Sequence, residues 1–463
     1  MEDMFVKIIS LLVKELYGCY DYDIKFNSDV TFIYGSNGCG KTTILNITEA
    51  IITGQLYKLF CYEFNYIELV YSPIQEENEF RKINIKQDKN ALYVNFDGEE
   101  NVVDKSNIRE DIRSSDRESR DVYRYYFNRY DILNKIKQTF NYVYLPLNRS
   151  SVLYDYEEDS DIFMLRRGRT RIPLENDFGI GSDTRDVAMM QIESLVNHNF
   201  SRINSNISKI SDDFRNEILK SLLEVNRQYT LDNIVLDIFK NEDTISELQK
   251  TNAAYIKMLK ELELLNKKEE EKYNKFFSEF IKEFITFQKS EGKNLSIDLV
   301  TKFQEISKIK DLIDIAEKME QRKTTARKPI EIFLKTMNEF IQNSEDGKQI
   351  KIDSLGRVYF ETEYNKRPIS IQYLSSGEKQ LMTFFANLIF NVKNSSSGIF
   401  VVDEPELSLH LSWQKIFVAK TLEINQNIQL IFATHSPEII GKMRNKMYKL
   451  EKKYVDKGGN KDE

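Results

Sequence analysis

The residues with the clearest chemical meaning lie near the start of the sequence, at positions 35–42. This segment (GSNGCGKT) matches the phosphate-binding pattern G-x-x-x-x-G-K-[ST] at every fixed position. Its glycines let the backbone turn tightly, so that successive N–H groups face the phosphate oxygens. Lys41 adds a positive charge for the outer phosphates, and the Thr42 hydroxyl is a suitable Mg²⁺ ligand. We therefore expect a nucleoside triphosphate to bind through Gly35, Asn37, Gly38, Gly40, Lys41, Thr42 and Thr43.

The residues on either side of this segment support the interpretation. Residues 30–34 (VTFIY) form a β-branched and aromatic run that predicts a strand, and residues 43–52 form an apolar run that predicts a buried helix. A helix that begins at the loop directs the positive end of its dipole at the phosphates. A chance glycine-rich turn would not need a strand before it and a helix behind it.

Two segments toward the C-terminus offer further contacts to phosphates. Residues 374–381 open an apolar helix with Ser375 and Gly377 at its start, where hydroxyl and N–H donors and the helix dipole favour an anion. Residues 429–434 predict a buried strand that ends at His435, which could hydrogen-bond the γ-phosphate or the attacking water. A lone histidine usually has a structural role, but its place at the end of a core strand favours function.

A pair of carboxylates follows another strand-like run. Residues 398–403 are apolar up to Asp403, which indicates a strand buried on both faces with a carboxylate at its C-terminal end. Asp403 would hold Mg²⁺, directly or through water, opposite Thr42. Glu404 is the next residue and would point in a different direction from Asp403, so it can orient and deprotonate the attacking water as a general base. The alternative is an ordinary acidic turn, but a phosphate loop upstream needs such a partner.

Taken in order, the phosphate loop, the Leu-Ser-x-Gly segment, the apolar strand with Asp-Glu and the terminal histidine resemble the ABC-type ATPase superfamily. The segments 406–410 (ELSLH) and 433–437 (ATHSP) are similar to its soluble SMC, RecF and OLD branch rather than to membrane transporters. His410 stands where the transporter pattern has Asp, and Ser376 and Glu378 stand where Gly and Gln are common. With these departures, the resemblance implies an ATPase whose hydrolysis is slow or regulated.

The resemblance also assigns a role to each matching residue. Within one subunit it implies ligands for the phosphates and Mg²⁺ (Lys41, Thr42, Asp403), a residue that activates water (Glu404) and a γ-phosphate sensor (His435). It further implies that Ser375 and Gly377 contact ATP held by a second subunit. The implied cofactors are ATP and Mg²⁺, and the implied assembly is a homodimer or a higher homo-oligomer.

The fold that the resemblance implies is an α/β, ABC-type P-loop ATPase head with a small antiparallel β lobe and an inserted helical, short coiled-coil-like domain. The head would be formed by residues 1–150 and 347–463, and the mainly helical insertion by residues 151–346. Residues 81–86 and 91–96 alternate apolar with polar around a turn, which predicts a hairpin in the antiparallel lobe.

The predicted insertion has few helix breakers. Residues 182–291 contain neither Gly nor Pro and are rich in Lys, Glu, Leu and Ile, which predicts helices. Further helices are expected at residues 295–320 and 329–342. Because the apolar periodicity breaks often, we expect a short antiparallel hairpin rather than a long two-stranded arm.

Composition limits the class of protein. A net charge of −7 argues against a protein that coats nucleic acid through a generally basic surface, although local basic patches remain open. Three irregularly spaced cysteines indicate a reducing compartment without a disulfide framework or a zinc site. The sequence has no apolar run long enough for a membrane span, and its acidic start does not resemble a secretory signal. We expect a soluble, cytoplasmic protein without membrane contact.

Three other features have open alternatives. Residues 166–171 (RRGRTR) predict an exposed loop that could contact nucleic-acid phosphates or an acidic partner, or could simply be solvated. Arg149, after a predicted strand, could contact nucleotide or a neighbouring subunit, or could lie on the surface. One of Tyr17, Tyr20 and Tyr22 could stack on adenine, although a strand tyrosine is the favoured interpretation.

ATPases of this size with a modest helical insertion look like the ATPase components of bacterial anti-phage systems, such as the Septu, PARIS and retron-associated types. OLD nucleases carry a metal-binding nuclease domain after the terminal histidine, for which residues 436–463 leave no room. We therefore expect an ATPase that controls a separate effector, a nuclease, in phage defence. The alternative is a RecF-like repair ATPase that binds DNA directly. A transporter motor ranks last, because the sequence offers no membrane segment and the insertion would obstruct docking to one.

Overall fold

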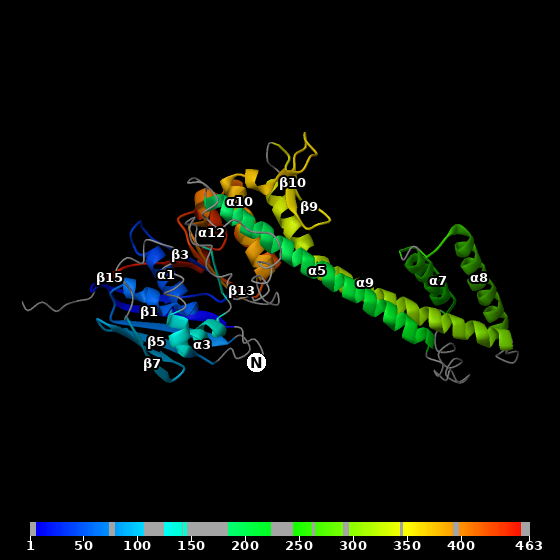
Figure 1. The fold of residues 1–463 in the computed structure, drawn as a ribbon, viewed down its shortest axis with the longest axis horizontal. Coiled ribbons are helices and arrows are strands. Elements are labelled where there is room, and N and C mark those ends of the chain that lie inside the picture. The colour runs from blue at the N-terminus through cyan, green and yellow to red at the C-terminus, as the bar shows by residue number, and fades with distance from the viewer. Residues whose placement is uncertain are drawn as a thin grey trace, which may run out of the picture. The chain divides into compact units, whose positions relative to one another are not determined.

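The computed structural model describes residues 6–73, 79–105, 125–140, 142–145, 184–223, 244–261, 264–289, 296–342, 346–391 and 398–454 (Figure 1). The chain divides into two compact units. Unit 1 comprises Met1–Asn199 and Pro329–Glu463, and unit 2 comprises Phe200–Lys328. The domain limits expected near residues 150 and 346 stay a prediction.

A five-stranded parallel sheet lies at the centre of unit 1. Its strand order is β14 (Met447–Lys449), β3 (Val30–Tyr34), β13 (Ile428–Ala433), β12 (Gly398–Asp403) and β8 (Tyr142–Leu145). Each neighbouring pair in this order is parallel. The carboxyl ends of β3, β13 and β12 therefore meet at one edge, and this edge carries the segments that the sequence singled out.

The two faces of this sheet pack into separate cores. Ile399 and Val401 of β12 belong to the core that includes α1 (Lys41–Ile52). Phe400 and Val402 belong to the core that includes α10 (Ser376–Ala386) and α11 (Leu411–Ile424). Because successive strand side chains point to opposite faces, burial on both faces requires an unbroken apolar run. This explains why the sequence of β12 is apolar throughout.

A seven-stranded antiparallel sheet forms a second layer of unit 1. Its order is β15 (Lys453–Tyr454), β2 (Tyr20–Lys25), β1 (Val6–Leu16), β4 (Tyr66–Pro73), β5 (Arg81–Gln87), β6 (Ala91–Phe96) and β7 (Glu99–Asp104). The predicted hairpin is confirmed as β5 and β6, although it is part of a larger sheet. A 3₁₀ turn, η1 (Leu56–Cys61), and helix α3 (Asp131–Thr139) pack into the same core as this sheet.

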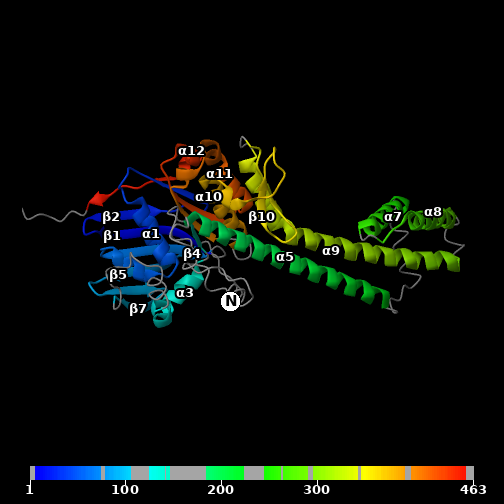
Figure 2. The same ribbon diagram turned by 45° about the horizontal axis from the view of Figure 1, so that its top comes forward.

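A three-stranded antiparallel sheet precedes α10. It comprises β9 (Gln349–Ile352), β10 (Val358–Glu361) and β11 (Ile369–Ser370), with β10 in the middle. A short 3₁₀ turn, η2 (Ile371–Tyr373), joins β11 to α10, and both views show β9 and β10 beside the last turns of α9 (Figures 1 and 2).

The described elements of unit 2 are helical, which confirms the helical insertion. They are α7 (Thr244–Glu261), α8 (Lys267–Lys289) and the greater part of α5 (Thr184–Leu223) and α9 (Ile297–Ile341). No helix in the described ranges is both long enough and apolar enough to cross a membrane.

Helix α9 corrects one sequence-based expectation. It is continuous over 45 residues, with Pro329 inside it, whereas two helices were expected at 295–320 and 329–342. Residues 321–328 (QRKTTARK) carry no large apolar side chain, so the apolar period stops although the residues still favour a helix. Helix α5 spans 40 residues and α9 spans 45, so the two helices are longer than those of the short antiparallel hairpin that the sequence predicted.

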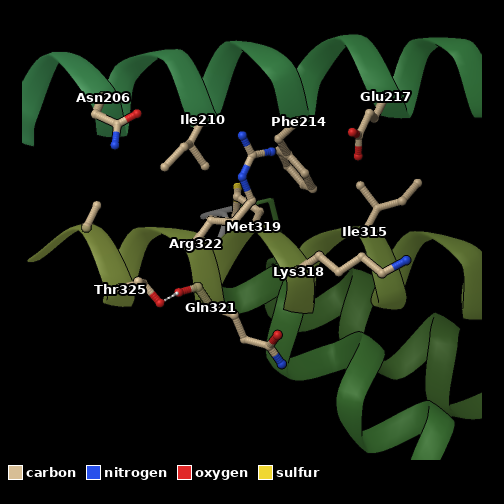
Figure 3. Close-up of a pocket in the computed structure, with 11 residues that line it drawn as sticks. Asn206, Ile210, Phe214, Glu217, Ile315, Lys318, Met319, Gln321, Arg322 and Thr325 are labelled. Carbon is tan, nitrogen blue, oxygen red and sulfur yellow. Dashed lines mark hydrogen bonds between the residues drawn. The ribbon is translucent and has the colours of Figure 1, made fainter. Parts of the chain in front are cut away.

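Within unit 2, α5 and α9 run antiparallel. Figure 3 shows Asn206 opposite Thr325 at one end of a groove and Glu217 opposite Ile315 at the other. The groove between them is lined by both apolar and charged side chains. Arg322 of α9 also pairs with Asp213 of α5 at 3.3 Å. These contacts hold the two helices together along this stretch.

Candidate nucleotide-binding site

The phosphate loop between β3 and α1 depends on glycine at two positions. Gly38 and Gly40 have φ angles of 76° and 103°, in the region that favours glycine. A Cβ atom on Gly40 would also lie only 2.7 Å from Oη of Tyr22. That hydroxyl donates a hydrogen bond of 2.9 Å to the carbonyl oxygen of Cys39, and burial raises the pKa of Tyr22 to about 12. Tyr22 therefore supports the loop and does not offer its ring to adenine.

Lys41 and Thr42 begin helix α1 directly behind the loop. The Lys41 side chain is largely buried, and its Nζ donates to the carbonyl oxygens of Gly35 at 3.2 Å and Ser36 at 3.5 Å. The loop therefore fixes this ammonium group through its own backbone. Thr42 is exposed, and its hydroxyl lies close enough to Asp403 to lower the pKa of that carboxyl. Among the other expected loop contacts, Asn37 is exposed and Thr43 is half-buried.

Asp403 lies at the end of β12, in register with Ala433 of β13. Burial raises the pKa of Asp403, and the neighbouring Thr42 hydroxyl acts in the opposite direction. Its Oδ1 atom is buried and has no hydrogen-bond partner among the described residues. A buried carboxylate oxygen without a donor is costly unless a cation or another partner meets it.

These residues fit a Mg²⁺ ion. The Thr42 hydroxyl and the Asp403 carboxylate are hard oxygen ligands of the type that Mg²⁺ prefers. The part of the chain that the structure describes contains no group of three His, Cys, Asp or Glu side chains that could hold a metal by itself. This suits an ion that takes its remaining ligands from phosphates and water.

Glu404 occupies a strained backbone position directly after β12. Its φ angle is 46°, in the left-handed region that non-glycine residues rarely adopt. Its N–H donates to the carbonyl oxygen of Ala433 at 2.8 Å, and a 3₁₀ turn, η5 (Pro405–Ser408), follows. Such strain persists only where the surrounding structure holds it, and it is common at functional sites.

Glu406 is a site residue that sequence reasoning did not assign. Its Oε1 accepts the backbone N–H of His435 at 2.6 Å, and its Oε2 accepts the Thr434 hydroxyl at 2.9 Å. The loop after β12 therefore holds the loop after β13 by two hydrogen bonds to one carboxylate. The sequence signal for Glu406 was its place in the segment that follows the Asp-Glu pair.

A second set of hydrogen bonds secures the same loop. The Ser436 hydroxyl donates to Oε1 of Gln414 at 2.6 Å and caps the short helix α12 (Pro437–Ile440). The Nε2 atom of Gln414 donates to the carbonyl oxygen of Leu409 at 2.9 Å. The His435 side chain itself is exposed at this edge. Its backbone is thus fixed while its imidazole remains accessible.

Ser375 and Gly377 open α10, a different element from those that bring Lys41, Asp403, Glu404 and His435 together. Ser375 is exposed and caps the helix, whereas Gly377 is buried. The structure explains one departure from the common pattern, because Glu378 forms a capping box with Ser375. His410 similarly caps α11, because its Nδ1 accepts the backbone N–H of Ser412 at 3.4 Å.

The other sequence candidates are Arg149, residues 166–171, Tyr17 and Tyr20. Arg149 and residues 166–171 lie outside the described residues. The Tyr20 ring packs against Tyr454 at 5.5 Å between centroids, and Tyr17 is half exposed. All three cysteines are free thiols.

The fold and this edge together define a P-loop architecture, in which a phosphate-binding loop joins strand β3 of a parallel sheet to helix α1. The family described as "AAA domain, putative AbiEii toxin, Type IV TA system" matches residues 145–441, which is well over half of the sequence. The chain therefore belongs to this family. The matched range includes Asp403, Glu404 and His435 and begins after the phosphate loop.

Two curated relatives resemble shorter stretches. "Retron Vc95 probable ATPase" from Vibrio cholerae serotype O1 biovar El Tor is 32% identical over 132 residues, which is 26% of this chain and 26% of that protein. "Retron Ec83 probable ATPase" from Escherichia coli is 33% identical over 84 residues, 16% of each chain. The chain thus matches about a quarter or less of the length of these relatives.

Solved structures of two kinds are similar over nearly the whole chain. The Smc head domain with an extended coiled coil from Pyrococcus furiosus, bound to the C-terminal domain of ScpA, has 13% identity and a TM-score of 0.39, covering 97% of this chain and 96% of that chain. RecF bound to ATPrS has 12% identity and a TM-score of 0.35, covering 98% and 100%. These similarities assign no role to individual residues of this chain.

Proposed function

We propose that this chain is a regulatory ATPase that binds ATP with Mg²⁺, hydrolyses it, and dimerises around it. The observation that carries the proposal is one sheet edge at which the phosphate loop, the partnerless oxygen of Asp403, the strained Glu404 and the fixed backbone of His435 converge. Each group is of the type that phosphoryl transfer to water requires.

The residues divide the reaction among them. Lys41 and the loop N–H groups bind the phosphates and offset their charge. Glu404 accepts a proton from water while the water oxygen bonds to the γ-phosphorus and the bond to the ADP oxygen breaks. The proton then leaves Glu404 to solvent, and His435 hydrogen-bonds the γ-phosphate. A Mg²⁺ ion on Thr42 and Asp403 would neutralise phosphate charge.

The dimer is supported by the position of the signature residues. Ser375 is exposed at the start of an apolar helix whose dipole favours an anion, yet it belongs to an element apart from the phosphate loop. A second copy that offers its Ser375 and Gly377 to the first copy's ATP would complete the site. In a two-fold arrangement both sites form by the same contact.

A complementation experiment tests this arrangement. Lys41→Ala disables phosphate binding by the loop and Ser375→Arg disables the signature segment, so each variant alone should be inactive. In a mixed dimer one site carries both defects and the other carries neither. Mixing equal amounts should therefore restore about a quarter of the wild-type hydrolysis rate. If the mixture stays inactive while each variant remains folded, the composite site is wrong.

We further propose that the ATPase controls a separate effector, a nuclease, in phage defence. The support is that two relatives are named retron ATPases and that the family description includes a toxin of a toxin–antitoxin system. Tagged wild-type and Glu404→Gln protein purified from the native host should retain the same nuclease in different amounts. Recovery of equal amounts of every partner, or of DNA alone, would contradict effector control, and DNA alone would favour a RecF-like role.

A further inference from the structure

The signature segment contains a buried carboxylate. Glu378 is 2% exposed, and its Oε2 accepts the backbone N–H of Ser375 at 2.7 Å. In return, the Ser375 hydroxyl accepts the N–H of Glu378 at 3.4 Å. Glu378 therefore fixes the backbone of Ser375, the residue that is expected to meet the nucleotide of a second copy.

Lys348 supplies the charge that this carboxylate needs. Its Nζ lies 3.1 Å from Oε1 and 3.3 Å from Oε2 of Glu378, and the two side chains are 17% and 3% exposed. A buried carboxylate without a cation would be strongly destabilising. A glutamine at position 378 would remove the negative charge from this ion pair, so the two residues are matched to each other.

Lys348 in turn lies next to a strand that is fixed to the end of α9. Asn338 of α9 exchanges two hydrogen bonds with Ile350 of β9, which donates its N–H to Oδ1 at 2.6 Å and accepts Nδ2 at 3.0 Å. Phe340 of α9 packs against Phe385 of α10 with 5.2 Å between ring centroids. The last turns of α9, β9 and the start of α10 thus form one connected block within unit 1.

We propose that Lys348 is a positioning residue for Ser375, and that Asn338 ties Lys348 to the final turns of α9. A displacement of this end of α9 is then transmitted to the exposed signature serine through Ile350, Lys348 and Glu378. The inference rests on the proposed composite ATP site, and it names the side chains of this chain that hold the signature half of that site.

The first test is hydrogen exchange in the nucleotide-free full chain. In Lys348→Met, the peptide that contains residues 374–380 should exchange about tenfold faster, because the Ser375 N–H loses its fixed acceptor. Lys348→Arg should restore slow exchange. The matched control is Lys351→Met, which removes an ion pair of 2.6 Å with Glu361 in the same sheet. It should leave this peptide within about twofold of wild type.

The second test measures dimer formation with ATP in a Glu404→Gln background. Adding Lys348→Met should weaken the dimer about tenfold while leaving the affinity of the phosphate loop for ATP unchanged. Replacing both charges, in Lys348→Met with Glu378→Gln, should recover part of the loss, because no charge stays buried alone. Asn338→Ala should weaken the dimer less than Lys348→Met does.

These outcomes separate the two proposals. If Glu404→Gln alone forms no dimer with ATP, the composite site fails, but the exchange result still decides whether Lys348 positions Ser375. Equal exchange in Lys348→Met and Lys351→Met would overturn the positioning role, and so would a loss of thermal stability in Lys348→Met without a change in residues 374–380.

Discussion

The phosphate loop and the signature segment are both helix starts suited to an anion, but they are held in different ways. Residues 35–42 are held by backbone geometry: two left-handed glycines, a tyrosine hydroxyl on a carbonyl oxygen, and a lysine bound to its own loop. Residues 375–378 are held by side-chain charge, through a buried glutamate and a lysine 30 residues away.

This difference has a consequence for regulation. A loop fixed mainly by its own backbone, with one hydroxyl from the neighbouring strand β2, depends little on movements of α9 or α10. A segment fixed by an ion pair to another element responds when that element moves, because removing one partner of a buried pair is costly. The phosphate loop is thus suited to constant ATP binding, and the signature segment to controlled closure of the dimer that we propose.

The largest effect is expected at Glu404, on the phosphate-loop side of this comparison. Glu404→Gln should lower kcat about 1000-fold, because an amide cannot accept the proton from water. ATP affinity and ATP-dependent dimer formation should persist, since the loop and the signature segment are unchanged. Hydrolysis is followed by phosphate release and dimerisation by light scattering. An unchanged kcat would mean that another group is the base.

Lys41→Ala should lower ATP affinity about 100-fold, because the charged contact to the outer phosphates is lost. The fold should persist, since the glycines and Tyr22 still shape the loop. Titration with a fluorescent ATP analogue measures the affinity. Lys58→Ala is the matched control, because Lys58 lies outside the loop and forms an ion pair of 3.2 Å with Glu49. If Lys41→Ala bound ATP as well as Lys58→Ala does, the loop would bind by backbone alone.

Glu406→Gln should have an intermediate effect, because it weakens the two hydrogen bonds that hold Thr434 and His435 and leaves the phosphate loop unchanged. We expect kcat to fall about tenfold, with little change in ATP affinity. Thr434→Val removes one of the same two hydrogen bonds and should lower kcat less. If the ATP affinity of Glu406→Gln fell as much as its kcat, Glu406 would support the whole sheet edge and not only His435.

The sequence predicted the parts of the site that depend on local residue types. The loop, its strand and its helix could be predicted because glycines, β-branched residues and an apolar run encode them directly. The hydrogen bond from His435 to Glu406 could not be predicted, because the two residues are 29 positions apart and are brought together only by the pairing of β12 with β13. The continuity of α9 was missed because its apolar face stops at residues 321–328 although its helix propensity does not.

The smallest expected effect concerns stability at Asp403. Its pKa is raised in the folded protein mainly by burial, so the folded state binds more protons than the unfolded chain at pH values between the ordinary and the raised pKa. The stability of the nucleotide-free protein should therefore fall as pH rises through that range. Asp403→Asn removes the buried charge and should raise stability by about 1 kcal/mol at pH 7.

The sign of this effect separates a metal site from a merely buried acid. The advantage of Asp403→Asn should disappear as pH falls below the ordinary pKa of aspartate, where the wild-type carboxyl is also neutral. It should also reverse with ATP and Mg²⁺, because a cation at the partnerless Oδ1 stabilises only the charged side chain. Thermal unfolding with and without nucleotide measures both. If Asp403→Asn stayed more stable than wild type with saturating ATP and Mg²⁺, the carboxylate would not be holding the metal.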